Sequence, residues 1–198
     1  GTHHVFYQSR GSATVWQTGD TYWGHVAGNL SHWWCLPAAI APGTDGDGSP
    51  TPYDKGGIFT GSVTVVGGVP IASYPGEPGD KWCLASPANL SDPLLVGWRK
   101  NRANPLGDDG TLGSTGGPLG CTGAWRDTSG NWTTTIQSNR HPQGPLRTAF
   151  FTVTSADFAT ARWRWAGDLQ CPVCDKLTTP CCDFYPLVCT EPSCSNQG

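Results

Sequence analysis

The 198-residue sequence contains no methionine, few charged residues and no long apolar run. A helix that crosses a membrane needs about 18 or more consecutive apolar residues, so no membrane span is expected. The 12 lysines and arginines are outnumbered by 15 acidic residues, which gives a net charge of −3. Because no basic field exists to attract a phosphate backbone, nucleic acid is excluded as a partner. The missing methionine, with a start at Gly1, indicates a processed product or a fragment.

Helical periodicity and ligand spacings are also lacking. No stretch carries an apolar stripe over three helical turns. The five histidines show no metal-ligand spacing beyond the adjacent pair His3-His4. The glycine-rich run Gly107–Gly120 does not match a phosphate loop between a strand and a helix. We therefore expect neither a metal nor a cofactor.

What the sequence does contain indicates a folded all-β protein. Its ten tryptophans argue against disorder. Short apolar runs rich in β-branched and aromatic residues alternate with Gly, Pro and Asp clusters, as in a sandwich, barrel or propeller. The pair Gly67-Gly68 predicts a tight hairpin, and Ser91–Val96 is interpreted as a loop. Strands are expected at His4–Gln8, Tyr22–Ala27, Ile58–Val66, Val69–Tyr74, Lys81–Ser86, Trp132–Ser138 and Ala149–Thr154, and longer loops at Gly43–Tyr53, Pro75–Asp80, Asn101–Gly120 and Gly167–Pro180.

Cysteine usage and glycosylation sequons favour a secreted, extracellular protein. Six of the nine cysteines crowd the last 28 residues, from Cys171 to Cys194. Three Asn-x-Ser/Thr acceptor sequons begin at Asn29, Asn89 and Asn131. The cysteines of the tail can form disulfides, belong to an unstructured tail, or bind a metal. Zinc ribbons pair two C-x₂-C knuckles, whereas this tail contains one.

A series of short motifs in a fixed order resembles glycoside hydrolase family 32, which includes invertases, inulinases and levanases. Each motif alone is weak, but their order along the chain is specific. The motifs are His4-Val5-Phe6-Tyr7-Gln8, Trp23-Gly24-His25, Leu30-Ser31-His32-Trp33, Leu36-Pro37-Ala38-Ala39-Ile40-Ala41-Pro42, Gly57-Ile58-Phe59-Thr60-Gly61-Ser62, Asn89-Leu90-Ser91-Asp92-Pro93-Leu94-Leu95, Trp125-Arg126-Asp127 and Asp183-Phe184-Tyr185-Pro186.

This resemblance implies a five-bladed β-propeller, incomplete here, that acts on β-fructofuranosides such as sucrose, inulin or levan. We assign residues 1–187 to a partial propeller domain and residues 188–198 to a cysteine-rich tail. The expected partner is a fructose-containing oligo- or polysaccharide. Members of the family are retaining glycosidases, which need a carboxylate nucleophile and a carboxylic acid donor about 5 to 5.5 Å apart.

By resemblance, Asp127 is the carboxylate that stabilises the transition state, with Arg126 beside it. The arginine would supply donors and keep the carboxylate ionised. Read locally, Arg-Asp-Thr-Ser-Gly is also an ordinary exposed turn. Thr128 stands where the family has proline, which departs from the pattern.

The resemblance also implies four sugar-binding residues. Phe59 and Thr60 match the pair that contacts the sugar, with threonine in place of the usual serine. Gln8 would present its amide to fructose hydroxyls, and Trp16 would line the pocket. Each of these residues also has a purely structural interpretation. Phe59 and Thr60 can be ordinary strand residues on alternating faces, Gln8 the polar end of a strand, and Trp16 a packing residue.

Two parts of the catalytic machinery do not match. The nucleophile motif of the family precedes the Phe-Tyr-Gln strand, ahead of this sequence, and the position of the acid/base glutamate is Pro180. General acid catalysis is typically worth 10²–10⁴-fold, so we expect the chain by itself to be inactive or nearly so. A fructosyl-sugar-binding propeller without activity and an interaction scaffold remain as alternatives.

Overall fold

The computed structural model describes residues 1–10, 21–78, 81–106, 118–121, 123–138, 147–153, 158 and 164–168. In these residues the secondary structure consists of β-strands and the short 3-10 turn η1 (Pro52–Asp54). The prediction of an all-β fold is therefore confirmed. None of the helical segments in the described part is long and apolar enough to cross a membrane. The predicted boundary at residues 187/188 and the cysteine-rich tail lie outside the described residues.

The first sheet is an antiparallel meander of β1 (His3–Arg10), β2 (Thr21–Gly28) and β3 (Trp33–Ile40). Phe6 pairs with His25 and Gln8 pairs with Trp23. Side chains directly opposite each other in an antiparallel pair lie on the same face. These four side chains therefore share one face of the sheet.

The second sheet contains β4 (Gly57–Ile58), β5 (Ser62–Val66), β6 (Val69–Glu77), β7 (Lys81–Pro87) and β8 (Trp98–Lys100). Both β4 and β5 pair with β6, so the first strand of this sheet is in two pieces. The tight turn at Gly67 and Gly68 joins β5 to β6, and both glycines have positive φ, of 58° and 85°. The predicted hairpin is confirmed.

The break between β4 and β5 lies opposite Pro75. The Pro75 carbonyl accepts a hydrogen bond of 3.0 Å from the Phe59 amide. In a strand, the N–H and C=O of one residue point to the same side, and proline has no N–H. The neighbouring strand is interrupted at this point, so the sheet does not need the N–H that Pro75 lacks. Proline can therefore occupy an inner position of the sheet.

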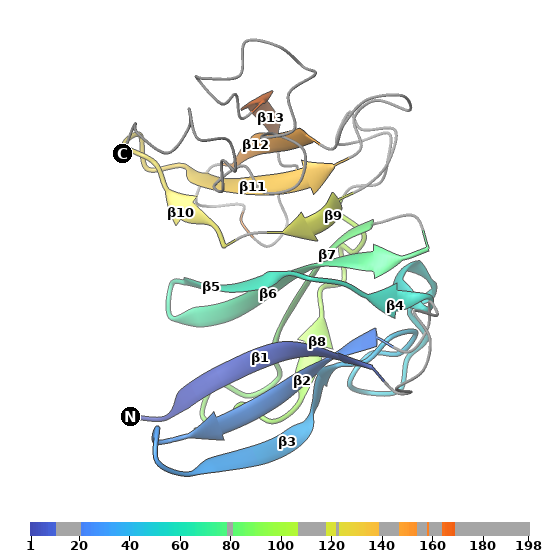
Figure 1. The fold of residues 1–198 in the computed structure, drawn as a ribbon, viewed down its shortest axis with the longest axis vertical. Coiled ribbons are helices and arrows are strands. Elements are labelled where there is room, and N and C mark those ends of the chain that lie inside the picture. Colours follow the sequence, from blue (N-terminus) through green and yellow to red (C-terminus); the bar gives the residue numbers. More distant parts are fainter. Residues whose placement is uncertain are drawn as a thin grey trace, which may run out of the picture.

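The third sheet repeats this design. It contains β9 (Pro118–Cys121), β10 (Trp125–Arg126), β11 (Trp132–Ser138), β12 (Arg147–Val153) and β13 (Arg164–Asp168). Both β9 and β10 pair with β11, so the first strand is again in two pieces. The three sheets follow one another along the long axis of the molecule (Figure 1), as successive blades of a propeller do. The number of five blades stays a prediction.

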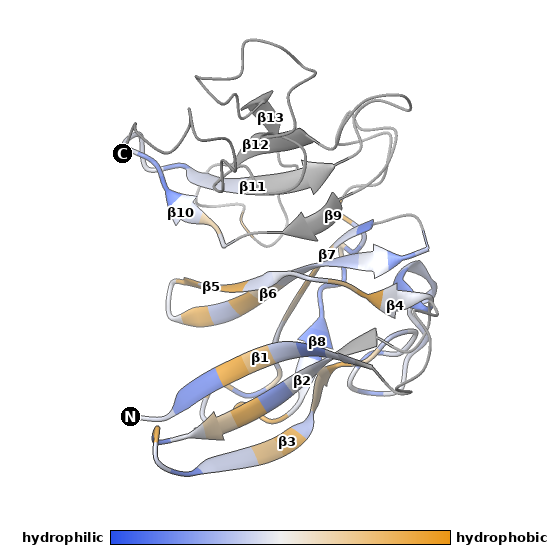
Figure 2. Cartoon of the chain, in the orientation of Figure 1, coloured by the Kyte–Doolittle hydropathy of each residue, from blue (hydrophilic) through white to orange (hydrophobic). Residues whose placement is uncertain are grey.

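The hydrophobic core lies on both faces of the middle sheet. One cluster joins this sheet to the first and includes Trp23, Ile58, Tyr74, Cys83 and Trp98. The other joins it to the third sheet and consists of Ile71, Trp82, Leu84, Trp132 and Phe158. Because both faces are covered, β6 and β7 carry unbroken buried runs instead of alternating ones. Figure 2 shows hydrophobic bands along β5 and β6 in this sheet.

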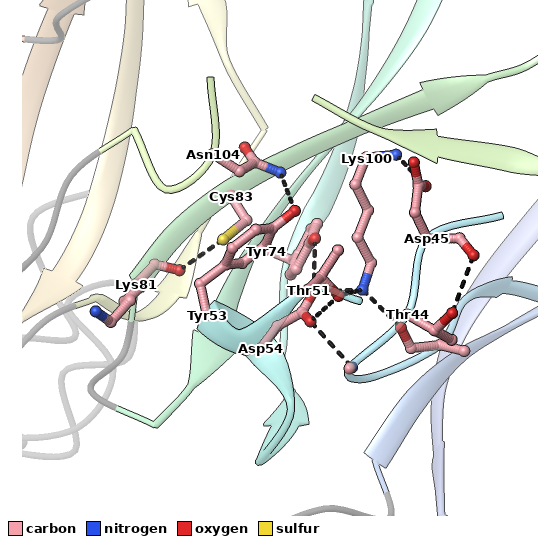
Figure 3. A network of polar contacts seen from close by, with 12 residues as sticks. Thr44, Asp45, Thr51, Tyr53, Asp54, Tyr74, Lys81, Cys83, Lys100 and Asn104 are labelled. Atoms are coloured by element: carbon pink, nitrogen blue, oxygen red, sulfur yellow. Dashed lines mark hydrogen bonds and ion pairs between the residues drawn. The ribbon is translucent and has the colours of Figure 1, made fainter. Parts of the chain in front are cut away.

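A buried polar network fixes the loop between β3 and β4 to the middle sheet (Figure 3). The Asp54 carboxylate accepts hydrogen bonds from the Gly43 amide at 3.0 Å, the Thr51 hydroxyl at 2.7 Å and the Tyr74 hydroxyl at 3.1 Å. Lys100 Nζ pairs with the same carboxylate at 2.5 Å and donates to the Ala41 carbonyl at 2.7 Å. Every polar atom of this pair is thus engaged, as burial requires.

The expected strands are largely found, with corrections at breaks and edges. Trp132–Ser138 has the predicted bounds, and Ser91–Val96 is a loop. Ile58–Val66 was expected as one strand and is two, and Pro75–Asp80 was expected as a loop although β6 continues to Glu77. Strands missed by the sequence patterns are β3, β8, β9, β10 and β13.

Candidate functional site

A hollow of about 260 Å³ opens where the end of β1 meets the break between β4 and β5. It lies between the first and second sheets, whose facing sides carry the cluster around Trp23. The lining residues are Phe6, Tyr7, Gln8, Trp23, Thr60, Gly61, Ser62 and Val63. The hollow is therefore lined by two of the predicted sugar-binding residues, Gln8 and Thr60, whereas the predicted Phe59 is not among its lining residues.

Gln8 bridges the two sheets at this hollow. Its Oε1 accepts a hydrogen bond of 3.0 Å from the exposed Thr60 hydroxyl, and its Nε2 donates to the Ile58 carbonyl at 3.4 Å. These contacts set the orientation of the amide, since the oxygen faces a donor and the nitrogen faces an acceptor. Among the described residues, one lone pair and one N–H of the amide have no further partner, nor has a lone pair on Thr60 Oγ1.

Trp23 and Gly61 hold the segment between β4 and β5 in place. The indole Nε1 of Trp23, a side chain that is only 4% exposed, donates to the Phe59 carbonyl at 3.0 Å. A Cβ on Gly61 would collide with the Ser73 carbonyl oxygen and would lie 2.7 Å from the Trp23 ring. Glycine is therefore required at position 61. Neither residue was predicted as part of the site, although the Trp-Gly-His and Thr-Gly-Ser motifs contain them.

Asp127 lies at the turn between β10 and β11. Its Oδ1 accepts hydrogen bonds from the amides of Ser129 at 2.8 Å and Asn131 at 2.9 Å. Its backbone N–H donates to the Asn131 carbonyl at 2.9 Å, and Gly130 completes the turn with a φ of 82°. The carboxylate thus caps its own hairpin turn, which is a common task of aspartate in turns.

The third sheet contacts the second beside β5, since the Ala124 amide donates to the Thr64 hydroxyl at 2.9 Å. Asp127 follows Ala124 by three residues and is not among the residues that line the hollow.

The expected convergence of Asp127 with Gln8 and Phe59 therefore stays a prediction, and in the described residues the Asp127 carboxylate is engaged at its turn. Arg126 is exposed, and its guanidinium carbon lies 5.1 Å from the centre of the Trp132 ring, at the same end of the hairpin. This contact stabilises the edge of the third sheet. Trp16 lies outside the described residues. The catalytic role of Asp127 stays a prediction.

A pair of histidines adjoins the hollow on the shared face of β1 and β2. The Phe6 ring, which lines the hollow, stacks on His25 with ring centres 4.4 Å apart. His4 Nδ1 lies 3.0 Å from His25 Nε2, so one ring donates to the other. Burial of the imidazole, and secondarily the charge of His4, lowers the pKa of His25 to about 4. His25 is therefore neutral near pH 7.

Comparison with known proteins decides the family. The sequence model described as "Glycosyl hydrolases family 32 N-terminal domain" matches residues 1–195. The chain belongs to glycosyl hydrolase family 32. The N-terminal domain of this family is a β-propeller, which agrees with the three successive sheets and confirms the predicted fold class.

Similar proteins in family 32 include plant fructosidases. The chain is 33% identical over 192 residues to acid beta-fructofuranosidase 1, vacuolar, of a Rosa hybrid cultivar, covering 94% of this chain and 30% of that protein. It is 32% identical over 193 residues to beta-fructofuranosidase, insoluble isoenzyme 6, of Oryza sativa subsp. japonica, with the same coverage. Fructan 1-exohydrolase IIa of Cichorium intybus superposes with a TM-score of 0.67 and 27% identity, over 84% of this chain and 29% of that one. The chain thus spans about 30% of the length of these family 32 relatives.

Proposed function

We propose that the hollow at Gln8 and Thr60 binds the fructosyl unit of sucrose or a fructan, as part of a family 32 glycoside hydrolase domain. The observation that carries this proposal is the amide–hydroxyl pair at the mouth of the hollow, with the indole of Trp23 in its wall. Membership of the family and the names of the relatives, which include β-fructofuranosidases and a fructan exohydrolase bound to 1-kestose, support the choice of sugar.

The residues of the hollow supply the interactions that a sugar ring needs. The N–H and lone pairs of Gln8 and Thr60 that have no partner among the described residues form an alternating set of donors and acceptors for neighbouring hydroxyls. The apolar side chains of Phe6, Trp23 and Val63 offer surface to the C–H groups of the ring. Because the Gln8 amide is already oriented, binding costs little ordering of this side chain.

Cleavage needs chemical groups that the described lining of this hollow does not contain. A retaining glycosidase uses two carboxylates about 5 to 5.5 Å apart. None of the eight lining residues carries a carboxylate. We therefore propose that this chain alone binds the sugar without hydrolysing it. The lack of a carboxylate in the described lining thus favours, for the isolated chain, the alternative of a sugar-binding propeller without activity.

The test measures binding and turnover on the same purified chain. Titration calorimetry with fructose, sucrose and 1-kestose is expected to show saturable binding, weakened about tenfold or more by Gln8→Ala, since truncation leaves polar groups of the ligand unpaired. Thr128→Ala, an exposed turn residue, is the matched control and should bind like the original chain. No reducing sugar should be released from sucrose or inulin. Absence of binding would remove the proposal in favour of a scaffold, and release of sugar abolished by Asp127→Asn would refute the proposed inactivity.

We also propose that the chain passes through the secretory pathway. The names of the relatives include a vacuolar and an insoluble form, and the sequons and cysteine usage of this chain support the proposal. Cys35 is exposed and Cys83 is buried, and disulfides involving the tail cysteines stay a prediction. Expression of the full natural gene product in a eukaryotic cell, with its location followed by fractionation, measures this directly.

A further inference from the structure

The three sequons occupy different surroundings in the structure. Asn29 lies on the turn between β2 and β3, and Asn89 lies on the loop between β7 and β8, both exposed. Their next residues, Leu30 and Leu90, are 66% and 52% exposed. Asn131, in contrast, is half-buried, and the residue that follows it, Trp132, is only 7% exposed and belongs to the core. Two of the three sequons are therefore accessible along their whole length.

The asparagine side chains of the two exposed sequons are held in the same way. Asn29 Oδ1 accepts hydrogen bonds from the amides of Ser31 at 3.2 Å and His32 at 3.0 Å. Asn89 Oδ1 accepts one from the Ser91 amide at 2.9 Å. Since the oxygen faces the backbone in both turns, the nitrogen Nδ2 points outward, and it has no hydrogen-bond partner among the described residues. A group attached to Nδ2 would break none of these contacts.

We propose that Asn29 and Asn89 are N-glycosylation sites and that Asn131 is not modified in the folded protein. In the transfer, Nδ2 loses one proton and bonds to the anomeric carbon of a lipid-pyrophosphate-linked oligosaccharide. The bond between that carbon and the phosphate oxygen breaks, and the lipid pyrophosphate leaves. The inference rests on the proposed passage through the secretory pathway, where this donor is found.

Both sites lie away from the hollow, so that glycans would leave it open. Gly28, next to Asn29, pairs with His3 at the start of β1, whereas Gln8 lies five residues further along that strand and pairs with Trp23. Burial lowers the pKa of His4 and the charge of Asp92 raises it, so the loop that follows Asn89 also adjoins the start of β1. Figure 1 shows the β2–β3 turn beside the N-terminus, at the opposite end of β1 from β4. The glycans would instead cover the exposed Leu30 and Leu90.

The experiment expresses the full chain, with a secretion leader and an appended flexible Asn-Gly-Thr tag, in a eukaryotic host. Glycans are released by a peptide N-glycosidase in ¹⁸O-water, which labels each formerly modified asparagine. The major form should be labelled at Asn29, Asn89 and the tag. Ser31→Ala and Ser91→Ala should each abolish one glycan while keeping the turn, because the Asn oxygen bonds to the backbone amide of that residue. Asn131→Gln is the matched control and should change nothing.

Labelling of the tag is the positive control, because it shows that the oligosaccharide-transferring enzyme acted on that molecule. Protein retained in microsomes is analysed together with secreted protein. A labelled tag with unmodified Asn29 and Asn89, or a major form modified at Asn131, would overturn the inference. Binding of fructose or 1-kestose is measured on the same preparation. Glycans without sugar binding would contradict the proposed function alone, and sugar binding without glycans would contradict the modification sites alone.

Discussion

The ammonium group of Lys100 lies 2.5 Å from the carboxylate of Asp54, and both side chains are almost completely buried, at 4% and 0% exposure. The first comes from the last strand of the middle sheet and the second from the 3-10 turn before β4. Burial lowers the pKa of Lys100, and the hydrogen bond to Asp54 opposes that effect. The pair therefore fixes the segment that leads into the hollow.

Replacement of Lys100 by methionine is expected to lower the free energy of unfolding by about 3 to 5 kcal/mol, because it leaves the buried Asp54 carboxylate without its cation. The comparison is Arg99→Met, which removes the exposed ion pair with Asp47 at 2.9 Å and should cost about 1 kcal/mol or less. Urea unfolding monitored by tryptophan fluorescence measures both. Equal effects of the two substitutions would contradict the importance of the buried pair.

Acid should destabilise the protein through His25, whose pKa is lowered from 6.5 to about 4 in the folded state. The unfolded chain takes up a proton below about pH 6.5, while the folded chain resists protonation until about pH 4. Stability from this residue is thus fully present above pH 6.5 and is lost as the pH falls toward 4, by an amount on the order of 3 kcal/mol.

The measurement is urea unfolding between pH 7.5 and 4.5 for the original chain and for His25→Gln. The substitution should flatten the pH dependence, because it removes the group that only the unfolded state protonates. His32→Gln, at an exposed position, serves as the control and should keep the original slope. An unchanged slope in His25→Gln would show that other groups cause the acid lability.

Local patterns were sufficient to predict the strands that are regular, and they failed where tertiary contacts decide. The Gly67-Gly68 hairpin follows from backbone preferences alone. The interruption after Ile58 does not, since it depends on the Trp23 indole and on the Pro75 carbonyl, which arrive from other strands. The edge strand β8 has three residues, too few for a periodic pattern.

Sequence motifs predicted the part of the candidate site that Gln8 and Thr60 form, where both residues lie at the same hollow. Gln8 comes from β1 of the first sheet and Thr60 from the break between β4 and β5 of the second, and they meet at the hollow. Asp127 was expected there from a short motif, but a motif gives no information on how far along its strand a residue lies. The contact between Ala124 and Thr64, which sets that position, joins residues 60 apart in sequence and has no sequence pattern of its own.

Gly61→Ala is expected to destabilise the fold and to damage the hollow together. The added methyl group would meet the Ser73 carbonyl and the Trp23 ring, so the Phe59–Gly61 segment must shift, at a cost of about 1 to 3 kcal/mol. Gly123→Ala is the matched control, since its nearest neighbour, the Thr64 hydroxyl, would be 3.9 Å from the new Cβ. Unfolding curves and sugar titrations should show losses for the first variant and none for the second.

Asp127→Ala separates the two interpretations of this carboxylate. If Asp127 caps the β10–β11 turn, its removal leaves the Ser129 and Asn131 amides without their acceptor and lowers the free energy of unfolding by about 1 to 3 kcal/mol. Binding of fructose should be unchanged, because Asp127 is not among the residues that line the hollow. Asp127→Asn keeps an oxygen acceptor and should recover much of the stability. A loss of sugar binding in both variants, with the unfolding curve of Asp127→Asn unchanged, would instead support the role that the family resemblance implies and contradict the placement of the turn.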